Sequence, residues 1–139
     1  MNRVVTGIAS AGAALVLIAS AVLAAPTAPV PPADVKNGEA VYGQCAACHS
    51  LGYDRTGPRH CGLIGRRAGS VAGFAYSDAM RRSNIVWTAR TLDRFLANPL
   101  QVVPGTAMGY AGVTDAKARK DLIAYLQAAN DGVDCVGAK

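Results

Sequence analysis

The chain has 139 residues, with 14 Lys and Arg against 9 Asp and Glu, and a formal net charge of +5 at pH 7. The basic residues are scattered, with no run of five or six, and this pattern excludes a nucleic-acid-binding protein. The length corresponds to a single domain.

Residues 1–24 have the layout of a secretory signal peptide. The start is positive, no charged residue occurs between residues 4 and 33, and Ala13–Ala19 is apolar throughout. A site of small residues ending at Ala24 predicts cleavage after that position. The alternative is an uncleaved membrane anchor, because the uncharged run is long enough to span a bilayer. In both cases the rest of the chain is exported.

Residues 25–33 are rich in proline and predict a disordered lead-in, so the folded domain is expected over residues 34–139. Asp34 is the expected cap of a first helix. Val35, Gly38 and Tyr42 recur at helical spacing after it, so this helix is predicted to run towards the motif that follows.

Cys45-Ala46-Ala47-Cys48-His49 reads C-x-x-C-H, the attachment motif of a c-type haem. Two thiols at this spacing can form thioethers with the two vinyl groups of one porphyrin, and His49 then lies under the iron as an axial ligand. The alternatives are a thioredoxin-like dithiol, which needs a βαβ context, and half of a zinc site, which needs two further ligands. The chain offers no βαβ order of elements, so the motif favours one covalently attached haem c.

Residues 50–73 show little periodicity and much Gly, Pro and Arg, which predicts a long loop. In a compact domain so long a loop needs something to wrap around, and a haem edge would serve. Cap residues and helix breakers predict three further helices, at residues 77–82, 88–97 and 114–129. No strand alternation is evident, so the predicted fold class is all-α.

The second axial ligand is predicted by elimination among the histidines and methionines after residue 24. His60 follows His49 by eleven residues, and the chain between them would have to pass around the ring. Met80 lies in a predicted helix, where methionine usually packs. Met108 lies in a loop with Pro, Gly and small neighbours, which lets its thioether approach a flat ring. Met108 is therefore the predicted ligand, and an exposed loop methionine is the alternative.

From Asp34 to Leu126 the chain resembles a class I cytochrome c, of the soluble bacterial kind that is similar to mitochondrial cytochrome c. The resemblance implies the cytochrome c fold, with helices and long loops around one covalently bound haem. It also implies that Gly38 and Tyr42 meet Leu122 and Tyr125 where the first and last helices cross. The matching stretches, in the family's order, are Cys45–His49, Gly57-Pro58, Gly62–Arg66, Gly73–Ser77, Trp87, Leu96–Pro99, Pro104–Met108 and Leu122–Leu126.

The same resemblance gives four further residues a role in binding the cofactor. The carbonyl of Pro58 should accept a hydrogen bond from the distal ring nitrogen of His49 and fix its tautomer. Arg66, Tyr76 and Trp87 should surround a buried propionate, because a carboxylate away from water needs hydrogen-bond donors. Without the resemblance, Tyr76 and Trp87 would be interpreted as core aromatics.

Two departures from the family pattern bear on function. Phe95 stands where the family often has a tyrosine whose hydroxyl bonds the methionine sulfur. No lysine occurs between Lys36 and Lys117, so the lysine-ringed haem edge of the mitochondrial relatives is missing. Electrostatic steering of partners is therefore expected to be weaker or differently placed.

Cys61 and Cys135 remain after the haem takes its pair of thiols. The exported chain enters an oxidising compartment, and an even number of cysteines is left, so one disulfide is favoured. The resemblance places Cys61 in the loop under the last helix and Cys135 just beyond that helix. Two free thiols are the alternative.

These features predict a periplasmic single-electron carrier that shuttles electrons between redox complexes and is not an enzyme. The expected partners are membrane or periplasmic oxidoreductases, and the protein is expected to be a monomer that binds no nucleic acid. If the signal is retained, the protein is membrane-anchored. Two alternatives remain: a haem domain that is a fixed subunit of an oxidoreductase, and a haem sensor or peroxidase in which Met108 dissociates readily.

Overall fold

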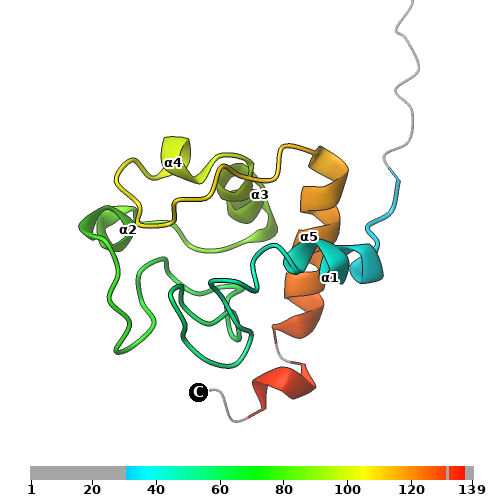
Figure 1. Ribbon diagram of the computed structural model, residues 1–139, viewed down its shortest axis with the longest axis horizontal. Helices are drawn as coiled ribbons and strands as arrows, with labels where there is room; N and C mark the ends of the chain where they lie inside the picture. The colour runs from blue at the N-terminus through cyan, green and yellow to red at the C-terminus, as the bar shows by residue number, and fades with distance from the viewer. Residues whose placement is uncertain (1–30, 131, 137–139) are drawn as a thin grey trace, which may run out of the picture. The chain divides into compact units, whose positions relative to one another are not determined.

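The computed structural model describes residues 31–130 and 132–136. The expected signal peptide and most of the expected lead-in lie outside these residues. The described part contains helices and one isolated β-bridge, between Arg67 and Val86, but no longer strand, which confirms the all-α prediction. None of its helices is long and apolar enough to cross a membrane. In chain order the elements are α1 (Val35–Tyr42), α2 (Asp78–Arg82), α3 (Ala89–Ala97), α4 (Pro99–Val102), α5 (Ala116–Ala129) and the 3-10 turn η1 (Val133–Cys135) (Figure 1).

Helix α1 begins at its predicted cap, because the Asp34 carboxylate accepts a hydrogen bond from the Asn37 backbone N–H at 3.0 Å. The helix ends at Tyr42, before the C-x-x-C-H motif. The chain then continues as tight turns, in which the N–H groups of Cys48 and His49 both donate to the carbonyl of Cys45, at 3.0 and 2.8 Å. These turns bring both thiols and the histidine to one place.

Helices α1 and α5 cross, as Figure 1 shows, and the predicted crossing is confirmed. A Cβ at Gly38 would overlap the carbonyl of Asp121 and lie 2.9 Å from the Cβ of Tyr125, so only glycine permits this approach. The rings of Tyr42 and Tyr125 lie 5.2 Å apart at the same crossing. Tyr42 and Leu122 belong to one buried apolar cluster.

A fully buried carboxylate fixes the same pair of helices. Asp121 on α5 accepts hydrogen bonds from the Asp34 backbone N–H at 2.9 Å and from the Asn37 side chain at 2.7 Å. Lys117 donates a third bond at 2.6 Å. These three donors, the lysine first, lower the pKa of Asp121 to about 2, so the buried group stays charged at neutral pH.

Two helix boundaries differ from the predictions. Helix α5 is capped by Asp115, not Thr114, because the Asp115 carboxylate accepts from a backbone N–H in the first turn of the helix. Asn98-Pro99 ends α3 as predicted but also starts the one-turn helix α4. The Asn98 side chain caps α4, and Pro99 occupies its first turn, where a missing N–H is harmless.

The segment of residues 43–77, which we call the motif loop, contains no helix, in agreement with the predicted long loop. A disulfide joins Cys61 in this loop to Cys135 in η1, with the two Cα atoms 5.3 Å apart, and confirms that prediction. Near it, the backbone N–H of Ile64 donates to the side chain of Asn130 at 2.8 Å. The loop is therefore attached to the end of α5 by covalent and polar contacts.

Candidate functional site

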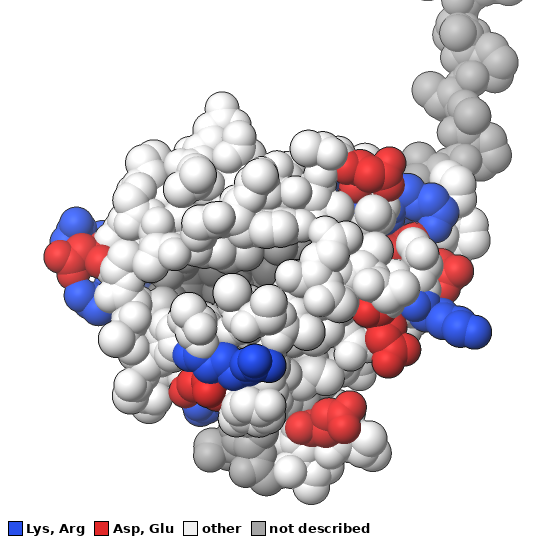
Figure 2. All heavy atoms as spheres, viewed as in Figure 1, with Lys and Arg blue, Asp and Glu red and all other residues white. Residues whose placement is uncertain are grey.

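A cleft of about 320 Å³ opens in the described domain. Figure 2 views a face that is hollowed between mostly uncharged side chains. The structure brings together every site residue that the sequence predicted, although they are spread over more than sixty positions. The residues in question, all of which line the cleft, are Cys45, Cys48, His49, Pro58, Arg66, Tyr76, Trp87 and Met108.

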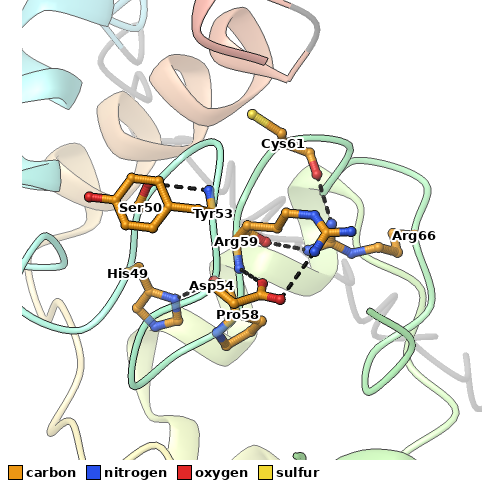
Figure 3. Close-up of polar contacts among 8 residues, drawn as sticks. All are labelled: His49, Ser50, Tyr53, Asp54, Pro58, Arg59, Cys61 and Arg66. Carbon is orange, nitrogen blue, oxygen red and sulfur yellow. Dashed lines mark hydrogen bonds and ion pairs between the residues drawn. The ribbon is translucent and has the colours of Figure 1, made fainter. Parts of the chain in front are cut away.

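The imidazole of His49 is oriented by the backbone of the motif loop. Its Nδ1 lies 2.8 Å from the carbonyl oxygen of Pro58 (Figure 3). Because a carbonyl can only accept, this bond requires the proton on Nδ1 and leaves the lone pair on Nε2 for a metal. A Cβ at Gly57 would collide with the ring of His49, so this turn requires glycine. Burial lowers the pKa of His49, which further favours the neutral, ligating form.

Cys45 and Cys48 do not pair with each other, and the disulfide in the described residues uses the other two cysteines. Burial raises the pKa of the Cys45 thiol, with the neighbouring Cys48 as a second cause. A reactive dithiol would need the opposite shift. No group of three or more His, Cys, Asp or Glu is placed to hold a metal ion within residues 31–130 and 132–136. The arrangement therefore supports neither a redox dithiol nor a zinc site.

A chain of polar contacts fixes the guanidinium of Arg66 beside the cleft (Figure 3). It donates to the carbonyls of Cys61 and Arg59, both at 2.8 Å. The backbone N–H of Arg59 donates to the carboxylate of Asp54 at 2.8 Å, and the Arg59 guanidinium forms an ion pair with the same carboxylate at 3.1 Å. A guanidinium has five N–H donors, so Arg66 keeps further donors for an anionic group.

The two aromatic side chains predicted for the same role lie near Arg66. The backbone N–H of Trp87 donates to the carbonyl of Arg66 at 2.9 Å, and the indole is 7% exposed. Burial raises the pKa of Tyr76, while the charge of Arg66 acts in the opposite direction. The phenol therefore stays a neutral donor at neutral pH. Guanidinium, phenol and indole all line the cleft, and each carries the hydrogen-bond donors that a carboxylate away from water requires.

Met108 lies on a loop that follows α4 and is partly buried against the apolar core. Gly105 has a φ of +88°, which makes the turn before it, and the N–H of Met108 donates to Thr106 Oγ1 at 3.2 Å. The hydroxyl of Tyr110 donates to the side chain of Gln44 at 2.9 Å. That bond joins the loop of Met108 to the residue that directly precedes the C-x-x-C-H motif. Met80, by contrast, is buried in the core cluster, as predicted for a packing residue, although it also lines the cleft.

His60 is a feature of the site that the sequence interpretation missed. Its ring stacks on that of His49, with centroids 4.3 Å apart and planes 21° from parallel. Its Nδ1 lies 3.2 Å from the hydroxyl of Tyr42. Two stacked rings cannot serve opposite faces of one flat cofactor, which agrees with the rejection of His60 as the second ligand. The sequence presents His60 only as a possible axial ligand, and no pattern in the chain indicates a stack on His49.

Burial, with the nearby His49 and Arg66 as further causes, lowers the pKa of His60 to about 3. The His60 imidazole is therefore neutral at physiological pH.

The chemistry of the cleft fits a haem. Thiols and an imidazole lie at one part of it, hydrogen-bond donors at another, and a thioether on the loop after α4. Many of the remaining lining residues are apolar, as a porphyrin face requires. Besides Tyr42, Met80 and Trp87, the buried apolar residues of this lining are Leu63, Leu92, Phe95, Leu96, Leu122 and Leu126.

Comparisons with known proteins point the same way. The cytochrome c family model matches residues 35–130. Cytochrome c2 of Blastochloris viridis is 44% identical over 112 residues, which cover 78% of this chain and 88% of the relative. Cytochrome c2 of Rhodomicrobium vannielii is 43% identical over 122 residues, with 86% and 91% covered. The solved structure of cytochrome cH from Methylobacterium extorquens aligns with a TM-score of 0.67 at 38% identity, covering 68% of this chain and 98% of that one.

Proposed function

The chain belongs to the cytochrome c family, and from this premise we propose that it shuttles single electrons between periplasmic redox complexes through a haem held by His49 and Met108. As a member of that family it holds a covalently bound haem c, carries electrons, is not an enzyme, and exchanges electrons with redox proteins. The observation that supports the finer proposal is the convergence of all eight predicted site residues on one cleft.

Each part of the proposed site has its own task. Cys45 and Cys48 would form the two thioethers, and His49 would offer Nε2 to the iron because Pro58 occupies its other nitrogen. Met108 would supply a thioether sulfur as the second protein ligand of the iron. The haem supplies one-electron chemistry when bound. With His49 and Met108 both committed to the iron, the chain would leave no coordination position for oxygen or peroxide.

Arg66, Tyr76 and Trp87 are proposed to hold a propionate. A buried carboxylate without donors would be strongly destabilised, and these three side chains supply donors of different geometry. Since Arg66 is fixed by two backbone carbonyls, it is oriented before any ligand arrives. Pre-oriented charges reorganise little when the iron changes its oxidation state, which suits rapid electron transfer.

Partners are proposed to dock over the mouth of the cleft. Arg66 is the only Lys, Arg, Asp or Glu among the described residues that line it. The exposed lining residues are all uncharged: Gln44, Cys48, Thr56, Ala75, Ala107 and Gly109. Docking would therefore rest on a small, uncharged contact, of the weak and transient kind that electron carriers use.

The named relatives are cytochromes c2 of bacteria, which supports a periplasmic location after removal of residues 1–24. Residues 25–33 would then link the new N-terminus to the haem domain of residues 34–139. The protein is proposed to act as a monomer.

The holoprotein from a host that matures c-type cytochromes tests this function. Intact mass reports haem attachment and signal removal, and stopped-flow oxidation and reduction report electron exchange with membranes that carry redox complexes. We expect a haem adduct, full reversible cycling and no rapid binding of carbon monoxide to the reduced protein at neutral pH. A colourless exported protein would overturn the proposal. Rapid carbon monoxide binding would favour a sensor or peroxidase, and permanent co-purification with an oxidoreductase would favour a fixed subunit.

A further inference from the structure

The ring of His49 is confined by its neighbours on more than one side. The carbonyl of Pro58 binds Nδ1 at the ring edge, and the backbone at Gly57 lies so close that an added Cβ would overlap the ring. His60 covers a flat face of the same ring, with centroids 4.3 Å apart. Rotation of the His49 plane would drive it into the His60 ring, so this contact determines the angle of the plane.

His60 is itself held in place from two directions. Its backbone N–H donates to the carbonyls of Ser50 and Leu51, at 3.0 and 3.1 Å. Its Nδ1 lies 3.2 Å from the hydroxyl of Tyr42, and the Tyr42 ring meets it edge-on with centroids 5.7 Å apart. Tyr42 is the last residue of α1 and is buried in the core. A rigid series of contacts therefore runs from the helix crossing through Tyr42 and His60 to His49.

We propose that His60 is a positioning residue for the haem iron, which fixes the plane of the His49 imidazole and lowers the reduction potential. This inference rests on the proposed function, in which His49 is an axial ligand. Oxidation of the iron places additional positive charge on the axial imidazole. The face of an aromatic ring carries negative charge density and attracts such a cation. The stacked ring of His60 therefore favours the ferric state.

Five forms of the full-length holoprotein test the inference: the wild type, His60→Leu, His60→Phe, Tyr42→Phe and Tyr125→Phe. Electron paramagnetic resonance of the ferric protein reports the orientation of the axial imidazole, and spectroelectrochemistry at fixed pH reports the midpoint potential. Neither the resonance pattern nor the midpoint potential should change if His60 only fills space. Tyr125→Phe is the matched control, because Tyr125 lies at the same helix crossing while Tyr42 carries the hydroxyl that meets His60.

In His60→Leu we expect a changed resonance pattern and an equilibrium constant for reduction that rises about fivefold, which is about 41 mV for a one-electron couple. His60→Phe keeps a stacked aromatic face and should restore most of the wild-type pattern. Tyr42→Phe should shift the pattern in the same direction as His60→Leu, but less. Tyr125→Phe should match the wild type.

A folded, low-spin His60→Leu protein with unchanged pattern and potential would overturn the inference while the proposed function stands. If His60→Leu does not retain haem, the two tyrosine variants decide, and equal patterns in both would overturn the inference. A wild-type ferric protein without a low-spin, histidine-ligated signal would overturn the proposed function, and the inference with it.

Discussion

The α1–α5 pair and the motif loop both border the cleft, but different interactions stabilise them. The helix pair rests on close backbone approach at Gly38 and on the buried Asp121. The motif loop contains no helix, and its position depends on the disulfide from Cys61 and on contacts such as the one between His49 and Pro58. The two helices, whose formation depends on local sequence patterns, thus provide a rigid frame. The motif loop places the thiols and the imidazole of His49 through contacts between residues that are not neighbours in the sequence.

Removal of the disulfide should have the largest effect on the loop. Cys61→Ala combined with Cys135→Ala opens a link across 74 positions, and the chain-entropy model gives an upper loss of about 4–5 kcal/mol. Guanidinium denaturation of the holoprotein, followed by the fluorescence of Trp87, measures the free energy of unfolding. The haem spectrum of the folded double variant should stay as in the wild type, because Arg66 binds the backbone carbonyl of Cys61 and not its sulfur. An unchanged denaturation midpoint would contradict the role given to the bridge.

Gly38→Val should separate helices α1 and α5 and destabilise the fold. The new side chain would overlap the carbonyl of Asp121 and force the two helices apart, with an expected loss of about 3 kcal/mol in the free energy of unfolding. Gly132→Ala is the matched control, since a Cβ there would make only ordinary contacts at 3.5 Å and should change stability by less than about 0.5 kcal/mol. Equal free energies of unfolding for the two variants would show that helices α1 and α5 need not approach so closely at Gly38.

The buried Asp121 should make the stability of the α1–α5 pair fall at acid pH. Its pKa falls from the usual 3.8 to about 2 on folding, chiefly through Lys117. The contribution of the carboxylate to stability is therefore complete above pH 3.8 and is lost as pH falls towards 2. Thermal unfolding between pH 5 and 2 should show this loss in the wild type, and Asp121→Asn should flatten it. Parallel pH profiles for the two proteins would assign the acid sensitivity to other groups.

The smallest expected effect is that of salt on electron exchange. Because the exposed lining of the cleft is uncharged, the rate with membrane-bound redox complexes should change less than about twofold between low and moderate ionic strength. Stopped-flow reduction at several salt concentrations measures this. A steep fall with added salt would show that charged side chains away from the mouth guide docking.

The sequence predicted most of the helices well because the signals for a helix are local. Ser77 and Thr88 cap α2 and α3 as expected, since cap chemistry depends on neighbouring residues alone. Helix α4 escaped prediction because a four-residue helix shows no periodicity. Thr114 and Asp115 are adjacent residues that can both cap a helix, and the sequence alone does not decide between them.

The site was predictable where a motif or the family resemblance carried it, as for Cys45 and Pro58. The stack of His60 on His49 was not, because it depends on the path of the loop between them. The bond between Tyr110 and Gln44 joins residues 66 positions apart, and no pattern in the chain indicates it. Contacts of this kind require the folded loop.

The central claim is that the iron is held between His49 and Met108, and a pair of methionine variants tests it most directly. Sulfur ligation of a ferric haem gives a weak near-infrared charge-transfer band, which can be recorded for the wild type, Met108→Ala and Met80→Leu. We predict that the band persists in Met80→Leu and disappears in Met108→Ala, whose reduced form then binds carbon monoxide. A band that survives in Met108→Ala, or one that is lost in Met80→Leu, would contradict the claim.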